Sequence, residues 1–384
     1  MVTRELKLVM EQQFSSEVQE EARRDVPEEI VVEILLRLPV KSLLRFKCVS
    51  KLWFSEISSA QFAKAHLNVS TSLLSNCRLL YSVLPLPYVL PLPYICSLDD
   101  QITPIPLDRN FNNWGCCNGW ICCSTEPTKP RLWNPSTKKV RYIGRSGVYD
   151  EWSETVYGFG YDELTDDYKV VEIIEPRYSC SISIFSVRRK WWKRLSESPK
   201  SVGKYCYLVN GALHWEAYPK HNWKRSNLPS SILSINLSTE AYQELDFPQP
   251  EHQLSHELIA TRIGVLKDCL CVCFYSSFNR VQVWMMKEYG MKESWYKFAS
   301  IPHMLVRGRQ FVPPIWLFEN GEILLIHGYK LMTYNPSEGN FKRCFRSADA
   351  EWWKCNIIDQ YSRDSRHKLF KRPECYVQSL IDLP

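Results

Sequence analysis

Three segments of similar sequence recur at a regular distance along the second half of the chain. Each has an aromatic or aliphatic residue, then Asn, then Pro or Leu, then Ser, with apolar residues soon after. Their asparagines, which stand 102 and 99 residues apart, are Asn134, Asn236 and Asn335. Two strand-like segments around Ser186 and Met286 divide these distances into steps of about 50 residues, a period typical of rings of small antiparallel sheets.

This period predicts an all-β propeller for residues 110–384. Each unit would be a small antiparallel sheet with Asn-Pro-Ser or Asn-Leu-Ser as a turn, because Asn side chains stabilise tight turns. At this period the region holds five or six kelch-like blades. A less regular array of β-sandwiches is also consistent with this sequence.

Ahead of the repeats, the chain divides into three further stretches. Residues 1–25 are polar and charged, and we expect them to be disordered or loosely helical. Residues 26–67 have helical periodicity, and residues 68–109 form a Pro-rich connector that cannot be continuous helix. The expected fold class is therefore α+β and multidomain, with a small three-helix unit before the all-β domain.

Residues 26–67 should form three short helices. The first carries an apolar stripe at helical spacing: Ile30, Ile34, Leu35 and Leu38. Asp25 can cap this helix, Pro27 suits its first turn, and Pro39 ends it. Such a small unit has a marginal core, so a partner protein would help to bury its apolar faces.

Charge and hydropathy restrict the location and the partners. The 48 Lys and Arg residues exceed the 42 Asp and Glu residues by only six. We read the basic stretch 342–372 as a solvated surface and expect no nucleic-acid partner. No apolar leader and no apolar run long enough for a membrane span is visible. We therefore expect a cytoplasmic or nuclear protein with no membrane partner, and its 15 Cys as thiols.

No residue pattern indicates catalysis, a metal or a cofactor. Cys269, Cys271 and Cys273 alternate along one side of a predicted strand, which favours core thiols over metal ligands. His214 is better explained as a packed strand residue than as a catalytic one. An enzymatic alternative is a polar site buried inside the propeller.

Several tryptophans are candidates for contact with a target protein. In the doublets Trp191-Trp192 and Trp352-Trp353, one ring of each pair should point inward and the other outward. The loop 218–231 carries a tryptophan flanked by cations, and we predict that it binds a target protein through Trp223, Lys224 and Arg225. A solvated loop with Trp223 folded back on its own blade is the alternative.

Residues 26–67 closely resemble an F-box. The matching elements are Val26-Pro27, Leu38-Pro39, Leu43 to Arg45, Cys48-Val49, Lys51 to Trp53, and Phe62 to Leu67. Val26 replaces the commoner Leu.

Residues 110–345 resemble the plant F-box-associated domain. The matching segments are CNGWICC, LWNPSTKKVR, YGFGYDELTDDYKVVEI, YLVNGALHW and VQVWMMKEYGMKESWYKF. The last segment also resembles S-locus F-box proteins.

This resemblance implies a non-catalytic adaptor of an SCF-type ubiquitin ligase. The F-box would bind a Skp-type adaptor and so, indirectly, a cullin scaffold, while the β domain holds a target protein for ubiquitin-dependent degradation. By resemblance, the adaptor contacts include Pro27, Ile30, Leu35, Leu38, Pro39, Leu43, Val49 and Trp53. Some of these residues would only hold the helices together. A scaffold that docks on the adaptor without turnover of a target is the alternative.

Overall fold

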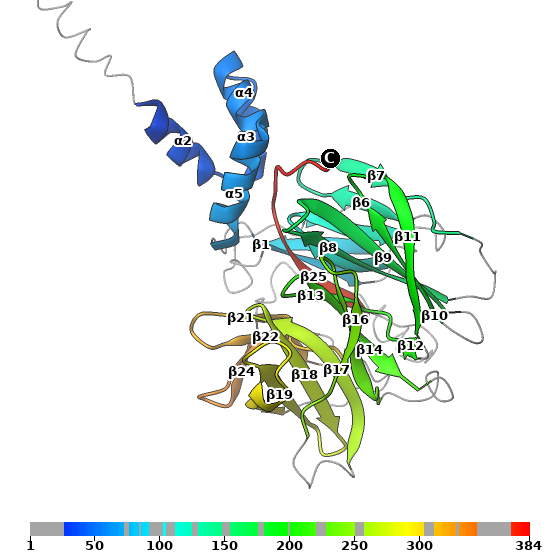
Figure 1. Cartoon of the computed structure of the whole chain (residues 1–384). Coiled ribbons are helices and arrows are strands. Elements are labelled where there is room, and N and C mark those ends of the chain that lie inside the picture. Colours follow the sequence, from blue (N-terminus) through cyan, green and yellow to red (C-terminus); the bar gives the residue numbers. More distant parts are fainter. Residues whose placement is uncertain are drawn as a thin grey trace, which may run out of the picture.

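A computed structural model of the chain describes residues 27–72, 77–83, 86–91, 103–104, 112–124, 130–147, 154–175, 180–198, 200–219, 228–249, 257–302, 311–327, 330–343 and 370–384. Helices come first and an all-β domain follows (Figure 1). The predicted α+β fold class is confirmed.

Four helices, one more than predicted, occur in the described N-terminal part: α2 (Glu28–Leu36), α3 (Val40–Phe46), α4 (Lys51–Ser58) and α5 (Ala60–Ser72). Pro27 and Pro39 are the N-cap residues of α2 and α3, and the Ser50 hydroxyl caps α4 by accepting the Trp53 N–H at 3.1 Å. Helix α5 was not predicted because its second half is mostly polar, which weakens its apolar stripe. Asp25 and Val26 lie outside the described residues.

The helices share a small core. Leu35, Leu43, Ile57 and Phe62 are buried together in it. On α5, the His66 imidazole Nε2 lies 2.9 Å from the Leu38 carbonyl, and burial lowers the pKa of this histidine. A neutral ring that donates to Leu38 therefore ties α5 to the end of α2.

Six antiparallel sheets make up the described β domain. The first combines β25 (Phe370–Val377), β1 (Cys77–Val83), β2 (Leu86–Pro91) and β3 (Thr103–Pro104). The second contains β4 (Asn112–Cys117), β5 (Trp120–Ser124), β6 (Arg131–Asn134) and β7 (Lys139–Tyr142). The third contains β8 (Glu154–Asp162), β9 (Asp167–Glu175), β10 (Cys180–Ser186) and β11 (Trp191–Ser198).

The other three sheets continue in chain order. The fourth contains β12 (Ser201–Val202), β13 (Tyr207–Val209), β14 (Ala212–Tyr218), β15 (Ser231–Asn236) and β16 (Tyr242–Leu245). The fifth contains β17 (Leu258–Leu266), β18 (Cys269–Ser276), β19 (Arg280–Met286) and β20 (Trp295–Pro302), with the 3-10 helix η3 (Lys292–Ser294) before β20. The sixth contains β21 (Trp316–Leu317), β22 (Ile323–His327), β23 (Lys330–Asn335) and β24 (Asn340–Arg343).

Apolar clusters join neighbouring sheets into a ring. Ile121 of the second sheet packs with Tyr376 of the first. Further clusters link the second sheet to the third, the third to the fourth, the fourth to the fifth and the fifth to the sixth. The ring closes where the Cys375 Sγ of the first sheet lies 4.0 Å from the carbonyl oxygen of Ile315, just before β21. The architecture is a propeller, as predicted.

The recurring asparagines form the turns that the repeat predicts. The Oδ1 atoms of Asn134, Asn236 and Asn335 each accept two backbone N–H groups, from the residues two and three positions further on, at 2.8–3.3 Å. These turns join the last two strands of the second, fourth and sixth sheets. The segments around Ser186 and Met286 lie at the corresponding places in the third and fifth sheets, so the period of about 50 residues is the spacing of the blades.

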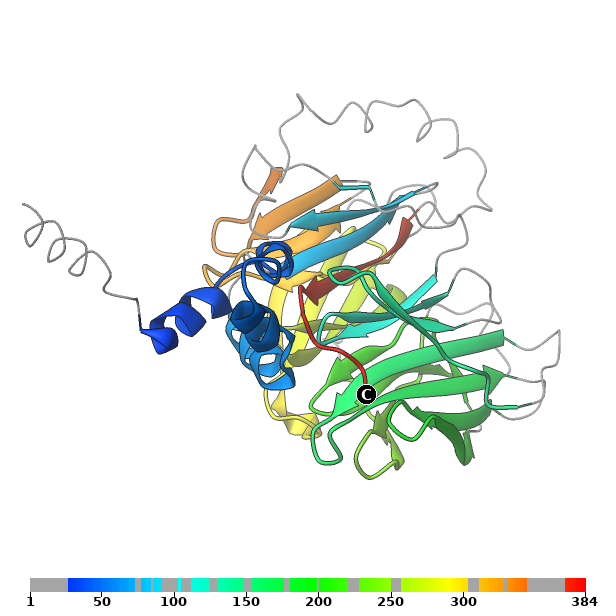
Figure 2. The same cartoon turned by 90° about the horizontal axis from the view of Figure 1, so that it is seen from above.

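Part of the predicted connector 68–109 is strand. β1 lies between β2 and β25 and pairs with both (Figure 2). The register places Cys77 opposite Val377. β3 pairs only with Tyr88 and Val89 of β2, so Pro87 and Pro91 lie outside that pairing, although both are in register with β1. The β domain therefore begins at residue 77 and not at 110.

Close approach of the third and fourth sheets depends on a glycine. A Cβ atom on Gly158 would lie 2.5 Å from the Trp215 ring and 2.7 Å from the Cys206 Sγ. Trp215 is fully buried, so its ring has no space to retreat.

We therefore predict that Gly158→Ala lowers the free energy of unfolding by about 1–3 kcal/mol, the usual cost of overpacking a core. Gly147→Ala is the matched control, because nothing lies within 4 Å of a Cβ at that position. Chemical denaturation of both variants measures the difference. Equal stability of the two variants would contradict the close packing of these sheets.

Candidate functional site

The described helices expose a set of large apolar side chains. We call it the helix face: Ile30 and Ile34 of α2, Val49 of the turn before α4, and Leu52 and Phe54 of α4. Each is 47–62% exposed, although burying such side chains is favourable. A group of this kind on a marginal helical unit is typical of a protein–protein contact.

The structure divides the predicted adaptor residues into two groups. Pro27, Ile30, Pro39 and Val49 are exposed, and Leu38 and Trp53 are half-buried. Leu35 and Leu43 are only 2% and 0% exposed, inside the helical core, where they hold the helices together, and their contact with an adaptor stays a prediction. Ile34, Leu52 and Phe54 were not predicted as adaptor contacts. Ile34 belongs to the apolar stripe of the first helix, and the sequence does not show that this member of the stripe is exposed.

The helices lie next to one end of the propeller and not next to the other. Turns between first and second strands and between third and fourth strands lie at the end next to the helices. They line a cleft of about 1200 Å³ between that end and α4 and α5. Because neighbouring strands are antiparallel, connections between second and third strands lie at the opposite end, which we call the far end.

Apolar side chains are also exposed at the far end. Phe278, in the turn between β18 and β19, is 67% exposed, and Leu228, before β15, is 40% exposed. The predicted target-binding residues Trp223, Lys224 and Arg225 belong to the same β14–β15 connection as Leu228, but they lie outside the described residues. Their role stays a prediction.

The tryptophan doublet on β11 points both ways, as predicted. Trp191 is 47% exposed, whereas Trp192 packs against Phe185 and donates from Nε1 to the Gly144 carbonyl at 2.7 Å. Trp352 and Trp353 lie outside the described residues.

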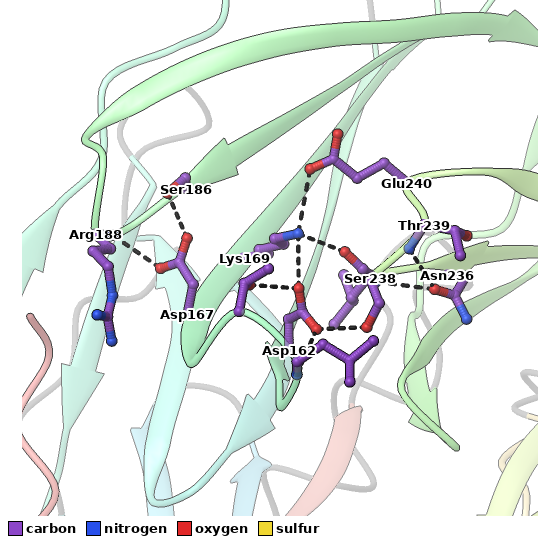
Figure 3. A network of polar contacts seen from close by, with 12 residues as sticks. Asp162, Asp167, Lys169, Ser186, Arg188, Asn236, Ser238, Thr239 and Glu240 are labelled. Atoms are coloured by element: carbon purple, nitrogen blue, oxygen red, sulfur yellow. Dashed lines mark hydrogen bonds and ion pairs between the residues drawn. The ribbon is translucent and has the colours of Figure 1, made fainter.

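A buried polar network links the third and fourth sheets (Figure 3). The Lys169 ammonium lies 3.0 Å from Asp162 Oδ2 and 3.2 Å from Glu240 Oε1, and it donates to the Leu237 carbonyl at 2.6 Å. Asp162 also accepts hydrogen bonds from Thr165 and Ser238. Its partners come from both sheets, so the network holds two blades together.

The charge state of this network is fixed. Burial alone would raise the pKa of Asp162, but hydrogen bonds from Ser238, Thr165 and Lys169, together with the Lys169 charge, lower it to about 2. A carboxylate that stays ionised and is surrounded by donors is poorly suited to exchange protons with a substrate at neutral pH. The arrangement therefore fits a structural role better than the buried catalytic site of the enzymatic alternative.

Other residues considered for chemistry lie in packed strands. His214 is buried in β14, where its Nδ1 lies 3.2 Å from the Tyr207 carbonyl and its Nε2 lies 2.8 Å from the Tyr289 hydroxyl. Desolvation lowers the pKa of His214 to about 4, so the ring is neutral at pH 7. Cys271 and Cys273 are fully buried in β18, as predicted for core thiols.

Two searches of the described residues give negative findings. They contain no group of three or more His, Cys, Asp or Glu side chains that could hold a metal ion. None of the helices that the structure describes is long and apolar enough to cross a membrane.

A helical unit with an apolar face, followed by a propeller, defines a two-part binding protein. The F-box domain family matches residues 24–64, and the F-box associated beta propeller domain family matches residues 94–383. The chain therefore belongs to the F-box proteins with an F-box-associated β-propeller. Members of this family are generally non-catalytic adaptors.

Similar proteins of Arabidopsis thaliana support the assignment to the F-box family. An F-box/kelch-repeat protein of Arabidopsis thaliana is 32% identical over 83% of this chain and 89% of its own length. The F-box protein CPR1 of the same plant is 29% identical over 72% of this chain and 73% of its own length. The predicted resemblance to plant F-box proteins is confirmed, whereas the S-locus subfamily stays a prediction.

Solved structures give only a weak likeness. An oligogalacturonate lyase in complex with manganese has a TM-score of 0.43 at 10% identity, over 77% of this chain and 83% of that chain. A likeness at this level has no bearing on function.

The buried network gives a testable stability difference. We predict that Lys169→Met lowers the free energy of unfolding by about 3–5 kcal/mol, because Asp162 is left as an uncompensated buried charge. Lys193→Met is the control. It removes an ammonium that also pairs with Glu240, but from a half-exposed position, so the change should stay within about 1 kcal/mol. Denaturant titration at pH 7 measures both, and similar losses would refute the structural role of Lys169.

Proposed function

We propose that this protein is the substrate-recognition subunit of an SCF-type cullin ubiquitin ligase. Its F-box would bind a Skp-type adaptor through the helix face, and its propeller would hold the target protein. The observation that carries the proposal is the exposed apolar set on α2 and α4, in a chain of the F-box family.

The proposed mechanism needs no active-site residue in this chain. The cullin scaffold carries the ubiquitin-charged enzyme, and the propeller holds a target lysine near it. Tethering raises the local concentration of that lysine at the thioester, so catalysis comes from proximity. The proposed location is the cytoplasm or the nucleus, where such assemblies meet their targets.

The helix face supports the adaptor role on physical grounds. Burying one large apolar side chain contributes roughly 1.5–3 kcal/mol, and several such residues gathered on two short helices would supply a typical interface core. Val49 and Ile30 belong to both the predicted adaptor set and the helix face. Leu35 and Leu43 support the interface indirectly, by holding the helices in position.

We propose the far end of the propeller as the target surface. Connections there lie away from the helices and from the cleft, so a large protein has access to them. Loops on a rigid ring can vary without disturbing the packing between blades, which suits recognition. Phe278 and Leu228 provide apolar anchors, and the loop with Trp223 would add an aromatic ring and cations.

The alternative is an adaptor-docked scaffold that binds a partner without its turnover. A reconstituted ligase with the captured partner separates the two. Ubiquitin chains on the partner, lost when the F-box is deleted, support the proposed function. Stable capture without modification favours the scaffold.

We predict that Ile34→Asp combined with Leu52→Asp weakens adaptor binding at least about tenfold, because each change places a charge where an apolar side chain would be buried. A titration of a purified Skp-type adaptor by calorimetry measures the effect. Leu164→Asp is the matched control, since Leu164 is 84% exposed on the propeller, outside the helix face. Unchanged affinity of the double variant would rule out the helix face as the adaptor site.

We predict that Phe278→Ala reduces capture of targets from proteasome-inhibited cells by at least about fivefold, the loss expected for an aromatic anchor. Adaptor binding and thermal stability should not change, because the side chain is exposed and distant from the helices. Tyr142→Ala, which removes an exposed ring from β7, is the control. If quantitative mass spectrometry finds equal capture by both variants, this turn is not part of the target surface.

A further inference from the structure

The segment after β25 runs between the helices and the propeller (Figure 1). We call residues 378–384 the strap. Ser379, Ile381 and Leu383 are buried, although the segment belongs to no helix or strand. It lines the cleft together with residues of α4 and α5 on one side and propeller turns on the other.

Polar contacts fix the strap to the second sheet. The Trp120 indole Nε1 donates to the Ile381 carbonyl at 2.9 Å, and the Asn134 amide Nδ2 donates to the Ser379 carbonyl at 3.1 Å. The Lys139 ammonium pairs with the Asp382 carboxylate. A Cβ on Gly119 would lie 2.4 Å from the Ser379 Cβ, so the strap passes this turn at a distance that requires glycine.

Apolar contacts join the strap to both parts of the molecule. Leu380 packs against the helical core and also against the cluster that joins the second and third sheets. Ile381 and Leu383 belong to that same cluster, together with Ala63 and Leu67 of α5. The strap is therefore shared by the helical core and the propeller core.

One polar contact between α5 and the propeller is an exposed ion pair. Lys64 pairs with Asp166 at 2.9 Å, but both side chains are about half exposed. Water and salt screen such a pair, so it contributes little to holding one orientation. The attachment of α5 therefore depends on apolar contacts, which the strap residues make together with Ala63 and Leu67.

We propose that the strap locks the F-box helices onto one end of the propeller, so that the helix face and the far end keep one fixed relation. Without it, the two parts would each stay folded and move relative to one another. Its value for ubiquitin transfer rests on the proposed function, because a fixed relation matters only if the helices carry an adaptor and the far end carries a target. The locking itself does not depend on that function.

Asn134 offers a selective way to loosen the strap. Its Oδ1 stabilises the β6–β7 turn, as Asn236 and Asn335 stabilise the turns of the fourth and sixth sheets, while its amide donates to the strap. Asn134→Asp keeps the acceptor of the turn and replaces the donor by a carboxylate that repels the Ser379 carbonyl. Asn335→Asp makes the same change at a partly exposed asparagine in a turn of the sixth sheet and serves as the control for the turn itself.

The test compares the full chain with four variants: Leu380→Asp, Asn134→Asp, Asn335→Asp and a deletion of residues 379–384. Hydrogen exchange followed by mass spectrometry measures protection in α5 and in the third to fifth sheets, and small-angle scattering measures the maximum dimension. For Leu380→Asp and the deletion, we expect exchange in α5 to rise at least tenfold and the maximum dimension to increase, with the sheets unchanged. Asn134→Asp should show the same effect more weakly, and Asn335→Asp should match the wild type.

Two outcomes would overturn the proposal. Unchanged α5 protection and scattering in Leu380→Asp and in the deletion would show that other contacts hold the helices. Loss of protection in all sheets of both variants would show that the segment is part of the folding core and not a separate lock. Adaptor binding is measured on the same samples, so that a failure of the proposed function can be distinguished from a failure of the strap proposal. Its absence in the wild-type chain would remove the proposed function but leave the exchange and scattering results valid.

Discussion

Pairing between β1 and β25 joins parts of the chain that are up to 300 positions apart in sequence, with Cys77 opposite Val377. This pairing completes the first sheet and gives every described sheet two neighbours in the ring. It also brings residue 378 beside the helices, because α5 ends at Ser72, shortly before β1. Ring closure and the attachment of the helices therefore depend on the same sheet.

Packing inside the ring leaves little room for chemistry. Apolar clusters fill the space between neighbouring sheets, and the buried charges of Lys169 and Asp162 satisfy one another and nearby donors and acceptors. Buried polar groups of this kind hold two blades in register. The surfaces available for binding lie outside the ring, on the helices and at the far end, which agrees with an adaptor that brings two proteins together.

Local signals in the sequence were sufficient for the repeat and for most helices. The turn of Asn134 depends on hydrogen bonds to residues two and three positions away, so its pattern is visible in a short segment. The first sheet was not predictable in this way, because β25 pairs across the whole length of the β domain. Adjacent residues Ile34 and Leu35 look alike in the sequence, yet one is exposed and the other buried. Which of them faces outward is decided by α5 and Leu380, and such tertiary contacts are not encoded within α2.

The position of β25 has a consequence for biosynthesis. The helices leave the ribosome first, but the strand that closes the ring follows about 300 residues later, and synthesis at 5–20 residues per second separates the two events by tens of seconds. During that interval the nascent chain carries an F-box without a closed ring. A chain that stops before residue 370 stays in this state, with helices able to fold and no means to close the first sheet. Synthesis of β25 is therefore the step after which the ring can close.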